Sequence, residues 1–443
     1  MSSSTIAKMR PTWWPGEQHE AFTEWALSQG ILINGVSPAR FPGRGLGMIA
    51  TRHIEKDEAI VTVPHEAMLT PSRIPTSFSS RFPDGTPTHA LYAAYLTNGD
   101  PADLEPYTLW RRTWPTRADF EASMPILWPA SFRRATNSEY SSSSSSSSRL
   151  PRPNVPRKTV ALLPPSISGQ WTTIPTQPRA HDYETTHQNL LAHQEQRLRR
   201  DWDIVVAVFP NTDWDQFTYH WLIVNTRSFF YLMPGQEPPE DRNDAMALLP
   251  FADYFNHSDV ACNVKFDGHH YVFRAAKEYD EGDEIYMSYG PHPNDFLLTE
   301  YGFYLKENES ETLYLDAIIF KDLSPKLQEE LDFHQYLGNY QLTAGGVCYR
   351  TEVAAAITYM RPKAWQDHVL GYSSQSVDER RSAEVVRSWI GAYIEEANTA
   401  IRYLESVLPG ESDQFRPEKV RTLLNRWRQI EQLCFQALDT VSC

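Results

Sequence analysis

Hydrophobic and polar positions divide the chain into an opening helix, a region of short strands and long helical regions. Residues 17–29 carry apolar side chains at helical spacing and are followed by Gly30, which predicts an amphipathic helix that stops at the glycine. Between residues 48 and 63 the pattern changes to short runs rich in β-branched residues, which predicts strands. From Thr88 onward the chain is helical and rich in aromatic residues.

Helical and strand-like patterns alternate again in the second half of the chain. Helices are predicted over residues 189–208 and about 214–229. Strand-like runs follow, and they are Asn263–Phe266, Tyr271–Phe273 and Glu284–Met287. Beyond residue 308 apolar side chains recur at helical spacing, most clearly over 386–408, and a last helix is predicted over 417–438. The pattern therefore predicts an α+β region followed by a helix bundle.

Two polar stretches interrupt the helical region that begins near residue 88. Residues 137–157 contain the serine run Ser141–Ser148 and a proline-rich continuation, a composition that cannot bury enough apolar surface to fold. Residues 170–188 form the second stretch. We expect both to be inserted segments, and retained intron sequence is an open alternative for either.

Length and charge narrow the class of protein. A chain of 443 residues predicts two or three units with separate cores. Lys+Arg 41 against Asp+Glu 56 gives a formal net charge of -15, which repels nucleic acid and attracts basic proteins. We therefore expect a basic protein partner and no nucleic-acid partner.

Cysteine usage and hydropathy bear on the compartment. The four cysteines are scattered, without a C-x-x-C pair, so neither a zinc cluster nor a disulfide framework is expected. No stretch approaches the roughly 18 apolar residues that a membrane span needs. The expectation is a soluble protein of the nucleus or cytoplasm, without membrane contact.

The glycine-rich segment Gly43-x-Gly45-x-Gly47 is the first candidate for chemistry. The dinucleotide-binding fingerprint needs a further glycine at position 48, where Met48 stands, so a phosphate-binding loop is not predicted. Two interpretations stay open. The segment is either a flexible surface loop or a turn whose backbone approaches a ligand closely.

His257 and Tyr289 are candidates that each have a simpler explanation. A lone histidine is more often structural, and metal binding with Asp253, or with His269 and His270, lacks the ligands that would complete a tetrahedral site. No metal is therefore expected. Because the chain has 22 tyrosines, any one of them is more often a packing residue than a catalytic one.

Taken together, four motifs resemble a SET-domain methyltransferase of the Rubisco large-subunit methyltransferase type. They are Gly43–Gly47, Asp253–Ser258, Met287–Gly290 and Glu300–Phe303, in the order of that family, with some two hundred residues between the first and the others. The resemblance implies an α+β fold: a SET β-fold with knot-like threading, interrupted by a helical insert, plus a C-terminal all-α substrate-binding domain.

The resemblance and the patterns together predict five segments. They are an N-terminal helical lead-in (1–30), the first part of the SET domain (31–95), a helical insert with the two low-complexity segments (96–225), the second part of the SET domain (226–305) and a helical domain of the Rubisco-methyltransferase type (306–443).

The resemblance also implies roles for single residues, with S-adenosylmethionine as cofactor. Tyr289 matches the tyrosine whose hydroxyl points into the active site, so it is the expected catalytic residue and part of the substrate site, which Asp253 and Phe229 would also line. His257 would not act as a general base. The residues implied to bind the cofactor are Gly45, Leu46, Gly47, Arg227, Asn256, His257, Tyr301 and Phe303.

The implied activity is protein-lysine N-methylation of a non-histone target, with a ribosomal protein as one candidate, by a protein expected to be a monomer. Two other interpretations stay open. The first is a protein-histidine N-methyltransferase, because imidazole has a lower pKa than an amine and loses its proton more easily. The second is a catalytically silent SET module that serves as a protein-binding scaffold.

Overall fold

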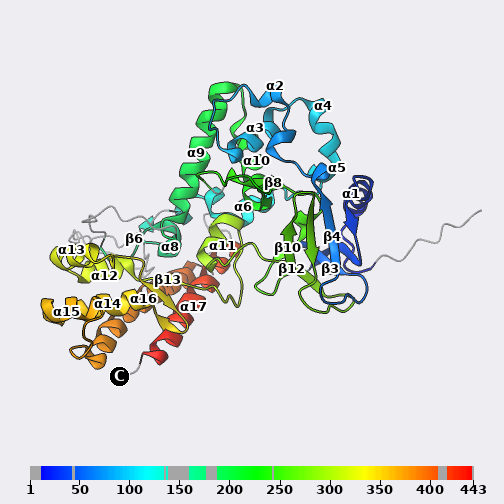
Figure 1. Cartoon of the computed structure of the whole chain (residues 1–443). Coiled ribbons are helices and arrows are strands. Elements are labelled where there is room, and N and C mark those ends of the chain that lie inside the picture. Colours follow the sequence, from blue (N-terminus) through cyan, green and yellow to red (C-terminus); the bar gives the residue numbers. More distant parts are fainter. Residues whose placement is uncertain are drawn as a thin grey trace, which may run out of the picture. The chain divides into compact units, whose positions relative to one another are not determined.

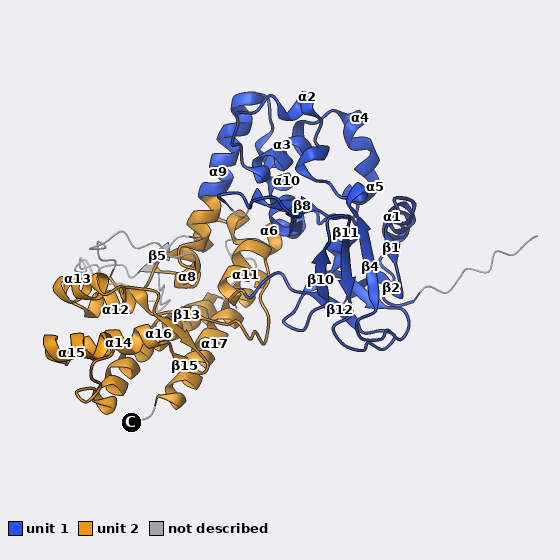
Figure 2. Ribbon diagram, in the orientation of Figure 1, with its two compact units in different colours: residues 1–120, 196–291 blue, residues 121–195, 292–443 orange. Residues whose placement is uncertain are grey.

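A computed structural model describes residues 11–41, 45–133, 136–137, 159–175, 187–241, 244–407 and 417–441. The chain forms two compact units (Figure 2). Unit 1 contains residues 1–120 and 196–291, and unit 2 contains residues 121–195 and 292–443. This division groups part of the predicted insert with the C-terminal helices. The five segments predicted from the sequence stay a prediction.

Two four-stranded sheets form the β part of unit 1. The first has the order β1-β4-β11-β10, with β1 (Leu32–Ile33), β4 (Ala59–Pro64), β10 (Asn263–Phe266) and β11 (His270–Arg274). The second has the order β2-β3-β12-β9, with β2 (Val36–Phe41), β3 (Gly45–Ala50), β9 (Asn256–His257) and β12 (Glu284–Met287). A separate pair joins β7 (Ser228–Phe230) to β8 (Met246–Leu248). The predicted strands of the second half are confirmed.

The second sheet joins residues that the sequence separates by more than two hundred positions. Strand β12 pairs antiparallel with β3, placing Glu284 opposite Ile49. On its other side β12 pairs parallel with β9, placing Tyr286 opposite Asn256. This pairing brings Gly45–Gly47 and the Asn-His segment to the same sheet, as the resemblance to the SET family implies.

The hairpin of β2 and β3 was not predicted. The sequence there is rich in glycine and proline, which are depleted in strands. Strand β2 is an edge strand that pairs only with β3, so Pro38 removes no hydrogen bond from a second neighbour. Gly45 and Gly47 therefore lie in a strand, β3, instead of a surface loop.

Most helices of unit 1 lie together at one end of the unit, whereas α1 lies beside the strands of the two four-stranded sheets (Figure 1). The longer ones are α1 (Glu17–Ser28), α3 (Thr88–Asn98), α10 (Trp214–Arg227) and most of α9 (Leu190–Val208). The short ones are η1 (His65–Ala67), η2 (Pro71–Arg73), α2 (Thr76–Ser79), α4 (Pro101–Leu104), η3 (Glu105–Tyr107), α5 (Thr108–Arg111), the start of α6 (Arg117–Ser123) and η6 (Ala252–Tyr254). The helices predicted near residues 17–29, 189–208 and 214–229 are confirmed.

Helix α10 packs on α3 through aromatic and polar contacts. The ring of His89 stacks on Trp221 with ring centroids 4.4 Å apart, and its Nε2 lies 3.0 Å from the Trp221 carbonyl oxygen. Both side chains are buried. Burial lowers the pKa of His89 to about 3, so this histidine is neutral in the folded protein near neutral pH.

We expect stability to fall as the pH drops from 7 to 5. The unfolded His89 takes up a proton below about pH 6.5, whereas the folded one resists protonation until about pH 3. The contribution of neutral His89 to the free energy of unfolding is therefore present above pH 6.5 and is lost as the pH falls. At pH 5 the loss is about 2 kcal/mol. Urea unfolding at both pH values checks this. The His89→Gln variant should show a shallower pH dependence, and an unchanged dependence would contradict the assignment.

Unit 2 is mainly helical. Its helices are η4 (Pro125–Leu127), α7 (Ala130–Arg133), α8 (Pro165–Ser168), α11 (Asn294–Tyr301), α12 (Asp316–Asp322), α13 (Pro325–Phe333), α14 (Tyr349–Ile357), α15 (Pro362–Val369), α16 (Glu379–Val407) and α17 (Pro417–Thr440). Its short strands are β5 (Thr136–Asn137), β6 (Thr159–Val160), β13 (Leu313–Tyr314), β14 (Gln341–Thr343) and β15 (Gly346–Val347). The predicted long helices at 386–408 and 417–438 are α16 and α17.

Part of the second polar stretch is folded into unit 2. The carboxylate of Glu396, which lies on α16 and is buried, accepts hydrogen bonds from the backbone N–H groups of Thr172 and Thr173 and from the Thr173 hydroxyl, at 2.6–2.7 Å. Trp171 packs edge-on against Tyr393 of the same helix. Residues 170–175 thus belong to the unit 2 fold. Residues 176–186, and residues 138–157 of the first stretch, lie outside the described residues.

Candidate functional site

The second sheet of unit 1 brings three of the motif segments to one place. The Asn256 side chain donates through Nδ2 to the Leu46 carbonyl oxygen and to Glu284 Oε1, both at 2.9 Å. Glu284 in turn accepts a hydrogen bond from the Tyr286 hydroxyl at 2.7 Å. One amide side chain therefore joins the glycine segment, the Asn-His segment and the strand that leads to Tyr289.

The glycines at positions 45 and 47 are required for different reasons. Gly45 has a φ of +83°, a conformation that side chains other than glycine rarely adopt, and no atom lies within 4 Å of an added Cβ. At Gly47 an added Cβ would lie 2.6 Å from Asn256 Nδ2 and 2.7 Å from Glu284 Oε1. The close approach at Gly47 is thus to the protein's own side chains.

Replacing Gly47 by alanine is expected to lower the free energy of unfolding by about 1–3 kcal/mol, because the half-buried side chains of Asn256 and Glu284 must move to admit the methyl group. Chemical unfolding measures this. Gly391→Ala is the matched control, since Gly391 lies within α16 with no atom within 4 Å of an added Cβ. That control should gain about 0.5–1 kcal/mol. Equal free energies of unfolding for Gly47→Ala and the parent would contradict the prediction, because the side chains around Gly47 would then move at no cost in stability.

Tyr289 follows β12 and contacts His257 and Phe255. Its backbone N–H donates to His257 Nδ1 at 3.0 Å, and the two rings stack with centroids 5.2 Å apart. Its hydroxyl donates to the Phe255 carbonyl oxygen at 2.7 Å, which leaves the lone pairs of the phenol oxygen as acceptors. Burial raises the pKa of Tyr289 to about 12, so the phenol stays protonated near neutral pH.

His257 is held as a neutral ring. Because its Nδ1 accepts from the Tyr289 N–H, the proton of the neutral ring sits on Nε2. Burial lowers the pKa of His257, which favours the same neutral form. The expectation that His257 is not a general base stays a prediction.

Arg227 and Asp253 form the other side of the site. Arg227 ends α10, and its Nη1 donates to the Asp253 carbonyl oxygen at 2.7 Å and lies 3.6 Å from the Asp253 carboxylate. Trp110 donates to that carboxylate at 2.9 Å. Burial raises the pKa of Asp253, and the nearby Arg227 opposes this shift. The Nε of Arg227 is buried without a hydrogen-bond partner among the described residues.

The turn that carries Asp253 begins at an unusual backbone position. Phe251 has a φ of +73° although it is not glycine, and its side chain is fully buried. Such conformations store strain and are held in place by the surrounding packing. Here the buried ring of Phe251, which packs against Phe22 and Tyr254, fixes the turn that presents Asp253.

The three remaining predicted site residues are Phe229, Tyr301 and Phe303. Phe229 is buried on β7, and its ring packs edge-on against Tyr271 and Phe273, so in the structure it is a core residue. Tyr301 ends α11 in unit 2, and Phe303 follows it with the two ring centroids 6.3 Å apart. Their predicted roles beside the cofactor, and that of Phe229 in the substrate site, stay predictions.

Two residues of the site were not found from the sequence. Glu284 is the acceptor for Asn256 and Tyr286, and Trp110 is the donor to Asp253. The alternation of a strand places Glu284 and Tyr286 on the same face, so a reading of β12 as a strand could have paired them. Nothing local marks Trp110, because its partner lies 143 positions away.

The described residues contain no group of three or more histidine, cysteine, aspartate or glutamate side chains that could hold a metal ion. In the described parts of the chain, no helix has both the length and the apolar composition to cross a membrane.

Unit 1 combines a sheet that joins the glycine and Asn-His segments with helices that lie between these segments in the chain. This arrangement agrees with the family to which the chain is similar. The profile of the SET domain matches residues 45–290, which is more than half of the chain. The chain belongs to the SET-domain family. The profile of the ribosomal lysine N-methyltransferase 2 C-terminal domain matches residues 311–440.

Several proteins are similar in sequence. Ribosomal lysine N-methyltransferase set11 of Schizosaccharomyces pombe is 27% identical over 252 residues, which cover 55% of this chain and 62% of the relative. SET domain-containing protein 4 of Homo sapiens is 23% identical over 94% of this chain and 88% of its own. Ribosomal lysine N-methyltransferase 2 of Saccharomyces cerevisiae is 28% identical over 51% of this chain and 47% of the relative. The matches to the two yeast relatives thus span less than two thirds of their length.

The fold resembles that of solved structures. The structure of Rubisco LSMT bound to AdoMet aligns with a TM-score of 0.57 at 13% identity, covering 96% of this chain and 93% of that one. The SET domain of LSMT bound to lysine and AdoHcy aligns with the same TM-score at 12% identity. This likeness confirms the predicted fold class, an α+β SET domain with a helical insert and a C-terminal helical domain.

Proposed function

We propose that this chain is an S-adenosylmethionine-dependent protein-lysine N-methyltransferase that acts on a ribosomal protein. The observation that carries the proposal is the junction at Asn256, which joins the glycine segment to the strand leading to Tyr289. The match of residues 311–440 to the C-terminal domain of a ribosomal lysine N-methyltransferase supports lysine and a ribosomal target. The names of two yeast relatives support the same target.

The residues of the site suit the cofactor. The backbone at Gly45–Gly47, together with Asn256 and His257, would hold it, and the resemblance adds Tyr301 and Phe303. Arg227 offers a buried Nε without a partner among the described residues, and a planar guanidinium suits the carboxylate of the cofactor's methionine part. When bound, the cofactor supplies a methyl group on a positively charged sulfur.

The residues around Tyr289 would then prepare the amine. A free lysine has a pKa near 10.4, so a neutral amine at pH 7 costs about 4.6 kcal/mol. A dry site that already holds a positive charge lowers this cost, because a second cation is disfavoured there. The lone pairs of the Tyr289 oxygen orient the amine, and alignment of two bound reactants supplies most of the acceleration.

The net charge of -15 supports a basic target, since the field of such a surface attracts cationic proteins. Ribosomal proteins that contact RNA have this character. We place the enzyme in the nucleus or cytoplasm, where such targets are made and assembled, and we expect it to act as a monomer. Its partners include neither nucleic acid nor membrane.

The two alternatives are a histidine N-methyltransferase and a catalytically silent scaffold. Labelling of protein distinguishes the first from a lysine enzyme, and binding of S-adenosylmethionine distinguishes the second. A histidine N-methyltransferase is supported by one short match, 44% identity over 50 residues to actin-histidine N-methyltransferase of Drosophila melanogaster, which covers 11% of this chain. The longer matches to lysine enzymes favour lysine. A silent scaffold would not bind the cofactor.

Calorimetric titration with S-adenosylmethionine tests the proposal. The parent protein should bind, and Asn256→Ala should bind at least tenfold more weakly, because it removes the amide that joins the two segments. Asn98→Ala is the matched control, a half-buried asparagine of unit 1 that is hydrogen-bonded to a backbone carbonyl oxygen, and it should bind like the parent. Absence of binding by the folded parent would favour the scaffold.

A further inference from the structure

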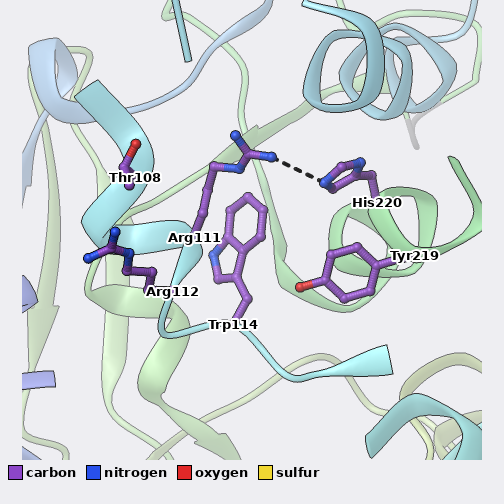
Figure 3. A pocket seen from close by; sticks show the side chains of 6 residues that line it. All are labelled: Thr108, Arg111, Arg112, Trp114, Tyr219 and His220. Carbon is purple, nitrogen blue, oxygen red and sulfur yellow. Dashed lines mark hydrogen bonds between the residues drawn. The ribbon is translucent and has the colours of Figure 1, made fainter. Parts of the chain in front are cut away.

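A small cavity lies in the helical part of unit 1, apart from the residues of the candidate site (Figure 3). Its volume is about 210 Å³. Its walls come from α5, from the turn after it and from α10. The lining residues are Thr108, Arg111, Arg112, Trp114, Tyr219 and His220. Two arginines thus line one cavity of a protein whose net charge is negative.

Neither arginine is paired with a carboxylate of the described residues. The side chain of Arg111 is half-buried, and this burial lowers its pKa because the charged form is less well solvated there. Its closest polar contact is 3.5 Å, from Nη2 to Nε2 of His220, and Figure 3 shows the guanidinium turned toward this ring. A half-buried guanidinium has five N–H donors, so most of the donors of Arg111 remain available.

The neighbouring hydrogen bonds fix His220 as an acceptor toward Arg111. The Thr97 hydroxyl donates its only proton to the Ala93 carbonyl oxygen at 2.7 Å. It therefore accepts from His220 Nδ1, 2.9 Å away, and the Nδ1 of His220 carries the proton of the neutral ring. The lone pair of Nε2 then faces Arg111. A neutral histidine orients the guanidinium without neutralising its charge.

Trp114 adds a further donor. Its side chain is 6% exposed, and its indole N–H is buried without an acceptor among the described residues. A buried donor without an acceptor is unfavourable unless a ligand or water satisfies it. The Tyr219 hydroxyl, which also lines the cavity, donates to the Pro115 carbonyl oxygen. The cavity therefore offers cationic and neutral donors without a matching anion.

We propose that this cavity binds a carboxylate side chain, an aspartate or glutamate of the protein substrate near the methylated lysine. Arginine recognises a carboxylate through two parallel hydrogen bonds. A carboxylate carries one negative charge and is easier to desolvate than a doubly charged phosphate, which suits a cavity with one half-buried guanidinium. The assignment of a protein substrate rests on the proposed function, whereas binding of a carboxylate does not.

The elements that hold the candidate site also line the cavity. Tyr219 and Arg227 lie eight positions apart on α10, which is about 12 Å along a helix axis. On α5, Trp110 bonds to Asp253 while the next residue, Arg111, lines the cavity. An extended peptide covers about 3.3 Å per residue, so the acidic residue is expected within about four positions of the lysine.

Direct binding tests the cavity without any methyl transfer. In protein labelled with ¹⁵N-tryptophan, the indole N–H signal of Trp114, identified by its loss in Trp114→Phe, should shift on addition of sodium acetate. Sodium chloride at equal ionic strength should leave it in place. Arg111→Gln should weaken acetate binding about tenfold, because a charge-assisted hydrogen bond is lost. Arg117→Gln, which removes an arginine paired with Asp215 outside the cavity, should bind acetate like the parent.

Two peptides, one with glutamate and one with glutamine, test whether the bound carboxylate comes from a protein substrate. The peptide Ac-Glu-Ala-Ala-Lys-amide should shift the Trp114 signal at about tenfold lower concentration than its glutamine counterpart, and this difference should vanish in Arg111→Gln. A signal that no anion moves, or that inorganic phosphate moves at lower concentration than acetate, would overturn the carboxylate assignment. Equal binding of the two peptides would overturn the assignment to substrate. Failure of the methyltransferase proposal would appear separately, as absence of S-adenosylmethionine binding.

Discussion

Tyr289→Phe is expected to lower kcat about 100-fold or more while cofactor binding stays within about threefold of the parent. The substitution removes only the hydroxyl that would orient the amine, and loss of one positioned polar group in an active site costs about 10²–10³ in rate. The ring remains and can still stack on His257. Transfer of label from S-adenosylmethionine to protein in a cell extract gives the rate, and calorimetry gives the binding.

Tyr95→Phe is the matched control for this substitution. The hydroxyl of Tyr95 also lies near a backbone carbonyl oxygen, that of Asp103, and burial raises the pKa of Tyr95 to about 12, as it does for Tyr289. It lies on α3, which contributes no residue to the candidate site. The control should label like the parent. Comparable losses in both variants would mean that removal of a buried hydroxyl acts through stability, and that Tyr289 has no special part in the reaction.

Arg426→Leu is expected to destabilise unit 2 by about 3–5 kcal/mol. Arg426 lies on α17 with its side chain 1% exposed, and it donates to Asp295 at 2.7 Å and to Glu311 at 2.9 Å. Leucine would leave two buried carboxylates without their cation, and an uncompensated buried charge is costly. Urea unfolding followed by circular dichroism measures the change.

Arg428→Gln, on the same helix, is the control for the ion pair. Its pair with Glu405 has side chains 53% and 48% exposed, so its loss should cost less than about 1 kcal/mol.

The pH dependence of stability provides a second check on Arg426→Leu. Burial raises the pKa of Glu311 above its usual value, and Arg426 opposes this shift. Without Arg426 the folded protein favours the protonated carboxyl more strongly, so stability falls as the pH rises. The deficit of Arg426→Leu should therefore be smaller at pH 5 than at pH 8, and the opposite trend would contradict this account.

The sequence predicted the helices and the order of the motifs because these depend on local patterns. Gly30 marks the end of α1, and Pro417 begins α17, as the periodicity and stop residues indicate. The convergence of Gly47 with Asn256 followed only from the resemblance to a family. Local patterns contain no information on which strands pair across more than two hundred residues.

Several features could not be read from the sequence because they depend on tertiary contacts. The edge position of β2 allows Pro38 in a strand. The segment at 170–175 is polar and looked like part of an insertion, yet Glu396 satisfies its backbone N–H groups. Arg111 carries no local mark of function, since its setting arises from His220 on another helix. For the segment at 170–175 and for Arg111 the partner is distant in the chain, and the partner determines the role.

Mass spectrometry tests most directly whether this protein methylates lysine with the help of Tyr289. A cell extract is incubated with the protein and with S-adenosylmethionine that carries a deuterated methyl group. We expect a deuterated methyl on lysine of a ribosomal protein, present with the parent and with Tyr95→Phe and strongly reduced with Tyr289→Phe. Deuterated methyl found only on histidine, or lysine labelling that is equal with the parent and Tyr289→Phe, would contradict this expectation.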